Sequence, residues 1–303
     1  MYSGIDLEWA NGDLIKFQKN PVENGSAFLK ETRPQGYHYN YTVNAVTLAG
    51  WIQWKDRISP RTRLTAGLRA EYVGYDYNNR MLDGNTRDDG TECGFGGCLY
   101  TRPADRHDSF NNISPELGLE YDLDDDRLLY MRAARGYRAP QATELYRLQS
   151  GQQVADLSPE TLDSIELGFK GVSESLSYDI AAYVMHKKNF IFRDADGFNI
   201  SDGKTKHRGL ELNLQAQASD SILISTNVSW ARHLYDFDRI LGRGEVIRKG
   251  NDIDTAPIWL GSLRAKWEPL SDKAIEAEWV YQGGYFLDAA NAHQYGGHNL
   301  VNI

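Results

Sequence analysis

The sequence predicts an all-β fold, because apolar and polar residues alternate with a period of two in many separate windows. Leu210, Leu212 and Leu214 alternate with polar neighbours, and residues 222–230 and 275–281 show the same pattern. A spacing of three and four residues, which a helix requires, is poorly supported in these windows. Neighbouring side chains in a strand point to opposite faces, so each strand is expected to have one apolar and one polar face.

The connections between these windows are alternately short and long. Short turns are predicted at residues 57–61, 122–127, 171–175, 218–221 and 269–273. Long polar connections are predicted at 80–109, 139–161, 194–204, 237–254 and 286–297. Antiparallel neighbours place every second connection at the same end of a sheet, so short turns collect at one end and long loops at the other. The sequence therefore predicts an antiparallel up-and-down transmembrane β-barrel wall of about a dozen strands.

The predicted strands are long. Residues 176–193 would extend about 55–60 Å at about 3.3 Å per residue, whereas a spanning strand needs only about 9–11 residues. Such strands project beyond a bilayer and indicate a large barrel. A soluble sandwich or an extracellular solenoid is the alternative, but a sandwich seldom uses strands this long and does not sort its loops by length.

The charge and the apolar runs limit the classes of partner. The chain has 33 basic and 42 acidic residues, a net charge of -9, which argues against a nucleic-acid partner. No apolar run approaches the roughly 18 residues of a spanning helix, and "MYSGIDLEWANG" lacks the features of a signal peptide. Neither observation conflicts with a barrel, whose wall needs apolar residues only at alternate positions.

The two cysteines lie in the Gly-rich segment "CGFGGC". A disulfide between Cys93 and Cys98, closing a loop tip in an oxidising compartment, is favoured over a pair of free thiols. The seven histidines are dispersed without a clean metal-ligand spacing, so no metal site is predicted.

Four segments resemble the barrel of a TonB-dependent outer-membrane receptor, and they follow one another in that family's order. They are "PRTRLTAGLRAEYVGYDY" (60–77), "NISPELGLEYDLDDDRLLYMRAARGYRAPQATELY" (112–146), "LSPETLDSIELGFKG" (157–171) and "KTKHRGLELNLQAQ" (204–217). The resemblance implies import of a scarce nutrient across the outer membrane of a Gram-negative bacterium, most often a ferric siderophore and otherwise haem, cobalamin or an oligosaccharide. It also implies surrounding lipid, a barrel of about 22 strands, and a plug domain on which the TonB complex pulls.

The same resemblance indicates a ligand vestibule beyond residue 138. Pro140 ends a strand, because proline lacks a ladder donor, and by resemblance Pro159 begins the return to the next strand. The loop between them offers charges and hydrogen bonds near the barrel mouth, and an early polar loop offers an aromatic cluster that would suit an aromatic ligand. The candidate ligand-binding residues are Arg138, Gln141, Glu144, Tyr146, Arg147, Tyr37, His38 and Tyr39. Ordinary solvated loop chemistry remains the alternative for each of them.

Several features of the family are missing from residues 1–303. The sequence shows no plug, no TonB-contacting segment and no signal peptide, and it has only about a dozen of about 22 strands. We therefore expect one partial barrel domain from a longer receptor: a curved sheet with two unpaired edges that does not transport on its own.

Two other functions remain as alternatives. A barrel protease or lipase would need a catalytic constellation, and the nearest candidate is His107 beside Asp108 and Ser109. Adjacent strand residues point to opposite faces, so these three form no triad, and we expect neither an enzyme nor a resident cofactor. Haem is disfavoured as a ligand, because residues 141–158 lack the histidine found there in haem-receptor relatives. A purely structural or adhesive barrel is the third hypothesis.

Overall fold

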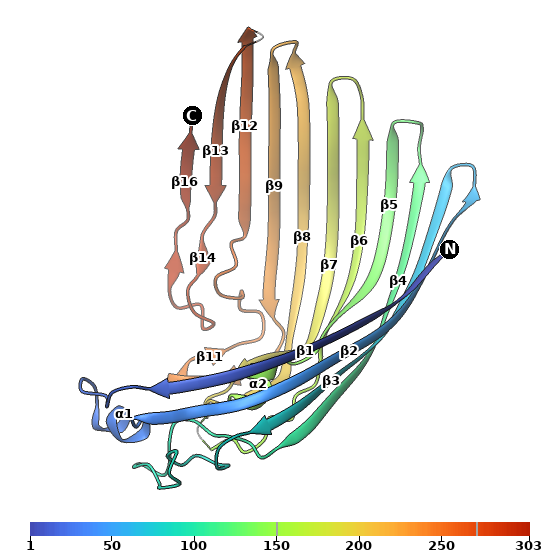
Figure 1. Ribbon diagram of the computed structural model, residues 1–303. Helices are drawn as coiled ribbons and strands as arrows, with labels where there is room; N and C mark the ends of the chain where they lie inside the picture. Colours follow the sequence, from blue (N-terminus) through green and yellow to red (C-terminus); the bar gives the residue numbers. More distant parts are fainter. Residues whose placement is uncertain (150, 271) are drawn as a thin grey trace.

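The chain forms one broad, curved, antiparallel sheet (Figure 1). The computed structural model describes residues 1–149, 151–270 and 272–303. Twelve strands are hydrogen-bonded in the order β1-β2-β3-β4-β5-β6-β7-β8-β9-β12-β13-β16, each beside its predecessor in the chain apart from short strands in the loops. The predicted all-β, up-and-down barrel wall is confirmed, and the sheet is open, with β1 and β16 at its edges.

The elements have the following bounds. The strands of the large sheet are β1 (Tyr2–Gln18), β2 (Gly36–Ser59), β3 (Thr62–Asn79), β4 (Arg106–Asp122), β5 (Arg127–Arg138), β6 (Glu160–Val172), β7 (Leu176–Arg193), β8 (Asn199–Ser219), β9 (Ile222–Tyr235), β12 (Trp259–Leu270), β13 (Lys273–Gln282) and β16 (His298–Asn302). The loops contain α1 (Ala27–Thr32), α2 (Ala142–Tyr146), the 3-10 turn η1 (Gly242–Gly244), β10 (Arg239–Ile240), β11 (Val246–Ile247), β14 (Tyr285–Phe286) and β15 (Gln294–Tyr295). No described helix is long and apolar enough to span a membrane.

The connections are sorted by length as predicted (Figure 1). Short turns join β2 to β3, β4 to β5, β6 to β7 and β8 to β9 at one end of the sheet, which we call the turn end. Long connections, among them residues 80–105 and 139–159, lie at the opposite end, the loop end. An additional long connection, residues 19–35, contains α1 and was not predicted.

The two faces of the sheet differ in chemistry, because strand register fixes which side chains share a face. Ile180 pairs with Leu212, and Leu212 pairs with Val228, in a continuous apolar surface that we call the belt face. One residue further along, Asp179 and Asn213 lie side by side on the polar lumen face. The belt on β9, from Ile222 to Trp230, is about 25–30 Å tall at about 3.3 Å per residue, which suits the hydrocarbon layer.

Aromatic residues on the belt face lie near both ends of this surface. Trp54, Tyr121 and Trp267 are exposed toward the turn end, and Trp9 and Trp259 are exposed toward the loop end. Such rows are typical of the two membrane–water interfaces of a barrel.

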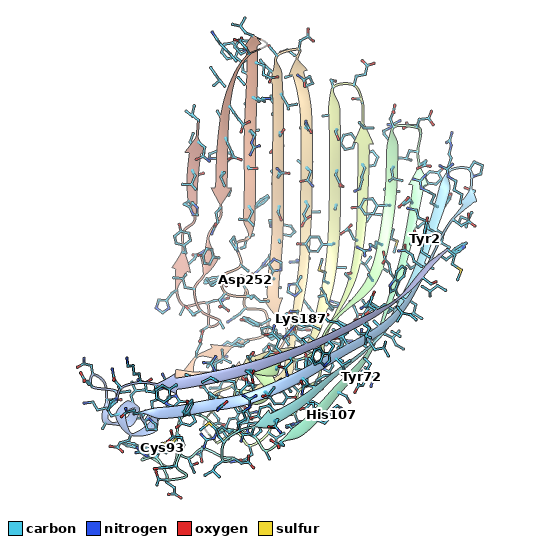
Figure 2. The ribbon with its side chains drawn as sticks, viewed as in Figure 1. Tyr2, Tyr72, Cys93, His107, Lys187 and Asp252 are labelled. Atoms are coloured by element: carbon cyan, nitrogen blue, oxygen red, sulfur yellow. A yellow bond between two sulfur atoms is a disulfide. The ribbon has the colours of Figure 1, made fainter. Side chains whose placement is uncertain are left out.

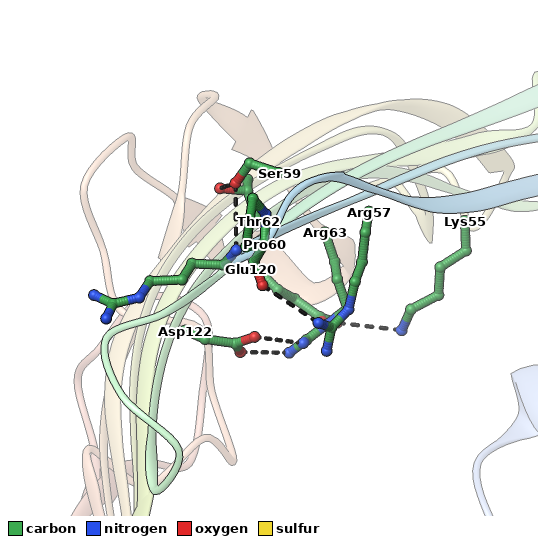
Figure 3. Close-up of polar contacts among 9 residues, drawn as sticks. Lys55, Arg57, Ser59, Pro60, Thr62, Arg63, Glu120 and Asp122 are labelled. Carbon is green, nitrogen blue, oxygen red and sulfur yellow. Dashed lines mark hydrogen bonds and ion pairs between the residues drawn. The ribbon is translucent and has the colours of Figure 1, made fainter.

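Ion pairs join neighbouring strands on the lumen face at the turn end (Figure 3). Arg63 on β3 donates from Nε to Glu120 at 2.7 Å and from both Nη atoms to Asp122 at 2.7 Å, and both carboxylates lie on β4. Lys55 on β2 lies 3.5 Å from Glu120. The paired charges tie β2, β3 and β4 together beside the turn that follows Ser59.

Close packing on the lumen face requires glycine at some positions. Gly168 on β6 pairs with Tyr130 on β5, and Gly209 on β8 pairs with Tyr183 on β7. In each pair, the tyrosine ring occupies the space where a Cβ on the glycine would lie. The ring covers backbone that a glycine would leave exposed, which stabilises the strand at its weakest residue.

Three predicted boundaries were wrong. Residues 37–39 lie in β2 rather than in a loop, the predicted loop 194–204 ends where β8 begins at Asn199, and β4 begins at Arg106 inside the predicted loop 80–109. The strands extend into polar sequence because main-chain pairing continues above the belt, where alternation of hydrophobicity is no longer required.

A charge on the belt face should be far more destabilising than the same charge on the lumen face. We expect Leu212→Arg to lower the free energy of unfolding in phospholipid vesicles by about 2–4 kcal/mol, because the guanidinium would enter the hydrocarbon layer. Asn213→Arg is the matched control, one residue away on the lumen face, and should cost under about 1 kcal/mol. Equal losses in denaturant titrations of the two variants would contradict the assignment of the faces.

Candidate functional site

Two long connections fold into the curve of the sheet and pack against its lumen face. Tyr39 and Tyr41 on β2, Tyr77 on β3 and Phe110 on β4 form one buried cluster with residues of the connections 80–105 and 139–159. The residues contributed by the connections are Cys93, Cys98, Tyr100, Leu145, Tyr146, Leu148, Ala155 and Leu157. This cluster, the loop core, gives the loop end a fixed shape.

The helix α2 is held against the strands through Tyr146. Its ring is fully buried and stacks on Tyr77 with centroids 4.3 Å apart, and its hydroxyl donates to Asp108 Oδ2 at 2.8 Å. Burial, reinforced by the Asp108 carboxylate, raises the pKa of Tyr146, so the phenol stays protonated and remains a donor. Just beyond α2, the carbonyl of Leu148 accepts a hydrogen bond from the Tyr39 hydroxyl.

Arg138, the last residue of β5, joins the loop to the sheet. Its Nε donates to Glu160 Oε2 at 2.9 Å across the strand pair, and its Nη1 donates to Glu144 Oε2 at 3.0 Å. Glu144 also accepts from the backbone amide of Gln141 at 2.7 Å, which caps α2. The hydrogen bond to Glu160 raises the pKa of Arg138 above its usual range.

Glu160, the first residue of β6, is buried, and its carboxylate has three partners. Besides Arg138, it accepts from the Ile191 amide at 2.9 Å and lies 3.4 Å from Lys187 Nζ. Burial alone would raise its pKa, but the bonds from Arg138 and the Ile191 amide and the charge of Lys187 outweigh burial and lower the pKa. The carboxylate therefore stays ionised and holds the base of the 139–159 loop.

The connection 80–105 is organised around a buried arginine. Arg102 is fully buried and donates to the carbonyls of Leu82 at 2.6 Å and Thr86 at 3.0 Å, and more weakly to that of His38 at 3.4 Å. Its guanidinium also lies 5.5 Å from the centroid of the Tyr100 ring. Carbonyl dipoles thus replace the water that the cation loses.

The same connection contains a disulfide between Cys93 and Cys98. Figure 2 shows Cys93 beside α1 at the loop end. Both cysteines are buried within the loop core, so the bridge fixes the connection where it packs against the strands.

A group of basic side chains lies beside the loop core without carboxylate partners; we call it the cation cluster and define it as Lys16, Arg33 and Arg147. Lys16 on β1 pairs with Tyr39 across the strands, and Arg147 ends α2. Burial and the positive charges of Arg147 and Arg33 lower the pKa of the Lys16 ammonium. Among the described residues, none of the three forms an ion pair with a carboxylate. Cations held together in this way favour a bound anion.

The predicted ligand-binding residues divide into two groups in the structure. Tyr37, Gln141 and Arg147 remain partly or fully exposed. The side chains of the others contact the protein itself. His38 is buried, stacks on Tyr100 and forms a hydrogen bond with the Pro34 carbonyl, and Tyr39 and Tyr146 are buried in the loop core. Arg138 and Glu144 form an ion pair with each other. In this arrangement, His38, Tyr39 and Tyr146 are withdrawn from solvent, whereas Arg138 and Glu144 are partly exposed but already paired with each other. Sequence reasoning missed Lys16 and Arg33, because their approach to Arg147 depends on how two distant loops fold.

The residues considered for catalysis do not form a catalytic site in the structure. His107, Asp108 and Ser109 pair with three successive residues of β3, so their side chains alternate between faces and form no triad; Asp108 bonds Tyr146 and Arg106. In the part of the chain that the structure describes, no group of three or more His, Cys, Asp or Glu side chains is placed to hold a metal ion.

Many known proteins share this fold. Residues 4–303 match the family described as "TonB dependent receptor-like, beta-barrel". The vitamin B12 transporter BtuB of Photobacterium profundum is 22% identical over 298 residues, which cover 94% of this chain and 45% of that protein. The chain thus spans less than half the length of that relative.

Solved structures agree on the fold. The ferric citrate transporter FecA in its unliganded form aligns with a TM-score of 0.73 and 17% identity over 99% of this chain and 42% of that one. The ferric-catecholate import receptor Fiu from Escherichia coli K12, in its closed form, aligns with a TM-score of 0.71 and 17% identity over 99% of this chain and 45% of that one.

Loss of the Glu160 charge should release the 139–159 loop. We expect Glu160→Gln to destabilise the docked loop by about 1–3 kcal/mol, because Arg138 and Lys187 lose their shared partner. Hydrogen exchange of residues 139–159 should then be faster than in the parent. Asp163→Asn is the matched control: it breaks the exposed Arg135–Asp163 pair between the same two strands and should cost about 0–1 kcal/mol.

The same carboxylate should make loop docking depend on pH. A lowered pKa in the folded state means that its contribution is fully present above the unfolded pKa, about 4.3, and is lost as pH falls through the folded value. The protection factors of the loop amides, which are corrected for the intrinsic pH dependence of exchange, should therefore fall on acidification below about pH 4 in the parent but not in Glu160→Gln. An identical pH profile in both proteins would assign the dependence to other groups.

Proposed function

This chain belongs to the family of TonB-dependent receptor-like β-barrels, and we propose that it forms a large part of the wall of an outer-membrane receptor that imports a ferric siderophore. Proteins with similar folds include importers of ferric citrate and of ferric catecholates. A related sequence is a vitamin B12 transporter, so the family alone does not select the ligand.

The observation that favours a ferric chelate is the cation cluster. The positive charges of Arg33 and Arg147 act on Lys16, and all three residues belong to the end of the sheet where the long loops gather. Among the described residues, none of the three is paired with a carboxylate. Carboxylate and catecholate complexes of ferric iron are anionic and would offset the mutual repulsion of these cations. A neutral corrinoid would gain nothing from them. Of the predicted residues, we propose that Arg147, Gln141 and Tyr37 contact the ligand and that the buried and paired residues hold the loop in shape.

The other parts of the proposal follow from the family. The belt face would contact outer-membrane lipid of a Gram-negative bacterium, and the TonB complex would act through a plug domain that lies outside residues 1–303. We propose that residues 1–303 form one partial barrel domain, which is not expected to transport by itself.

Family membership favours a receptor over a barrel protease, lipase or adhesin. A plug domain encoded beside this segment would support a receptor over these alternatives. Hydrolase assays test for protease or lipase activity.

Neutralising the cation cluster should weaken binding of an anionic chelate. In the receptor containing this chain, we expect Lys16→Gln combined with Arg147→Gln to raise the Kd for ferric citrate or a ferric tris-catecholate by about 10–100-fold. The physical reason is the loss of two charge-assisted contacts, measured by fluorescence titration and by uptake of radiolabelled iron.

Lys188→Gln is the control, because this exposed lysine lies on β7 with the parity of the belt face. It should leave both the Kd and uptake unchanged. If the double variant binds both chelates as tightly as the parent does, the cation cluster is not the ligand site.

A further inference from the structure

Two histidines that are far apart in the sequence lie side by side on the lumen face. His207 on β8 and His233 on β9 are register partners, their ring centroids are 5.0 Å apart, and their Nδ1 atoms are 2.8 Å apart. They lie three residues beyond the Leu210–Trp230 pair of the belt, toward the loop end. Both side chains are half-buried, so solutes in the lumen can reach them.

A third soft ligand extends this row onto the next strand. Met185 on β7 is the register partner of His207 and has the same parity, so its side chain leaves the strand on the lumen face beside that of His207. Directly opposite residues in an antiparallel pair have Cβ atoms about 4.5–5.5 Å apart. Met185, His207 and His233 thus form a continuous row across three strands, half-buried throughout.

The imidazole pair has the geometry of metal ligands. Two nitrogens that bind one ion at about 2.0–2.1 Å with a tetrahedral or trigonal angle are about 3.3–3.6 Å apart. The two Nδ1 atoms are 2.8 Å apart, so a bound ion would rotate the rings and move these atoms apart by about 0.5–0.8 Å. The other nitrogen of His207, Nε2, lies 2.8 Å from the hydroxyl of the buried Thr205. A hydrogen bond to the second ring nitrogen fixes ring orientation and is typical of metal-binding histidines.

We propose that Met185, His207 and His233 form a binding site for Cu(I) on the lumen wall. A thioether selects a soft ion, and imidazole suits copper, whereas ferric iron, magnesium and calcium prefer oxygen ligands. All three ligands are neutral, which suits a monovalent cation. Lys187 and Asp252, whose charges act on His207 and His233 respectively, are themselves paired: Lys187 lies 3.4 Å from Glu160, and Asp252 binds Arg232 at 3.1 Å.

The site is tested by titrating the receptor that contains this chain, in detergent micelles, with Cu(I) under anaerobic conditions against the competing chelator bicinchoninate. We expect one Cu(I) per chain, and His207→Gln combined with His233→Gln should raise the Kd at least about 100-fold. Met185→Leu, which keeps the volume of the side chain, should raise it about 10-fold and remove sulfur scattering from the copper X-ray absorption spectrum while nitrogen scattering remains.

His186→Gln is the matched control. His186 neighbours Met185 on β7 but has the opposite parity, so its replacement should leave the Kd unchanged. Circular dichroism verifies that each variant is folded, and Met185→Leu preserves a test if the histidine variant is not. The proposal is overturned if the parent binds Cu(I) no more tightly than the double histidine variant. A parent spectrum without sulfur scattering would also overturn it.

Discussion

Strand register is the constraint on which the rest of this structure depends. Main-chain hydrogen bonds fix which residues lie opposite each other, and a slip of one residue would turn every side chain to the other face. Because register is continuous from β1 to β16, one surface is apolar over its full width and the other is polar. The two faces, the aromatic rows and the row of Met185, His207 and His233 are all consequences of the same pairing.

At the loop end, the structure solves a different problem, which is how to bury charged side chains together with hydrogen-bond partners. Arg102 is surrounded by carbonyl oxygens, Glu160 by donors, and the Tyr146 hydroxyl by Asp108. An unpaired buried charge or donor would cost several kcal/mol, so these bonds determine the loop conformation as much as apolar burial does. The loop core is therefore rigid where it meets the strands, and cations at its border are held in defined positions.

The sequence was sufficient to predict the wall of the sheet. The strand from Leu176 to Arg193 was predicted with its observed bounds, because hydrophobic alternation and turn residues both act locally. Burial of His38 and Tyr146 was not predictable, since it arises only when two loops fold together against β2–β4. The pairing of His207 with His233 could have been predicted from the sequence. The two residues lie at equal distances from the turn between β8 and β9, so a strand register extended from that turn pairs them.

In the proposed function, the position of Arg147 connects loop packing to ligand binding. It ends α2, immediately after Tyr146, and its amide donates to the Thr143 carbonyl at 3.3 Å. Any bond that holds α2 against the strands therefore also holds the Arg147 guanidinium near Lys16. Docking brings like charges together, so it is opposed by repulsion in the absence of an anion and favoured in its presence. Linkage is reciprocal: an anion that binds the docked loop more tightly must stabilise docking by the same free energy. The Arg138–Glu160 pair, although it lies outside the cation cluster, then contributes to affinity through the population of the docked loop.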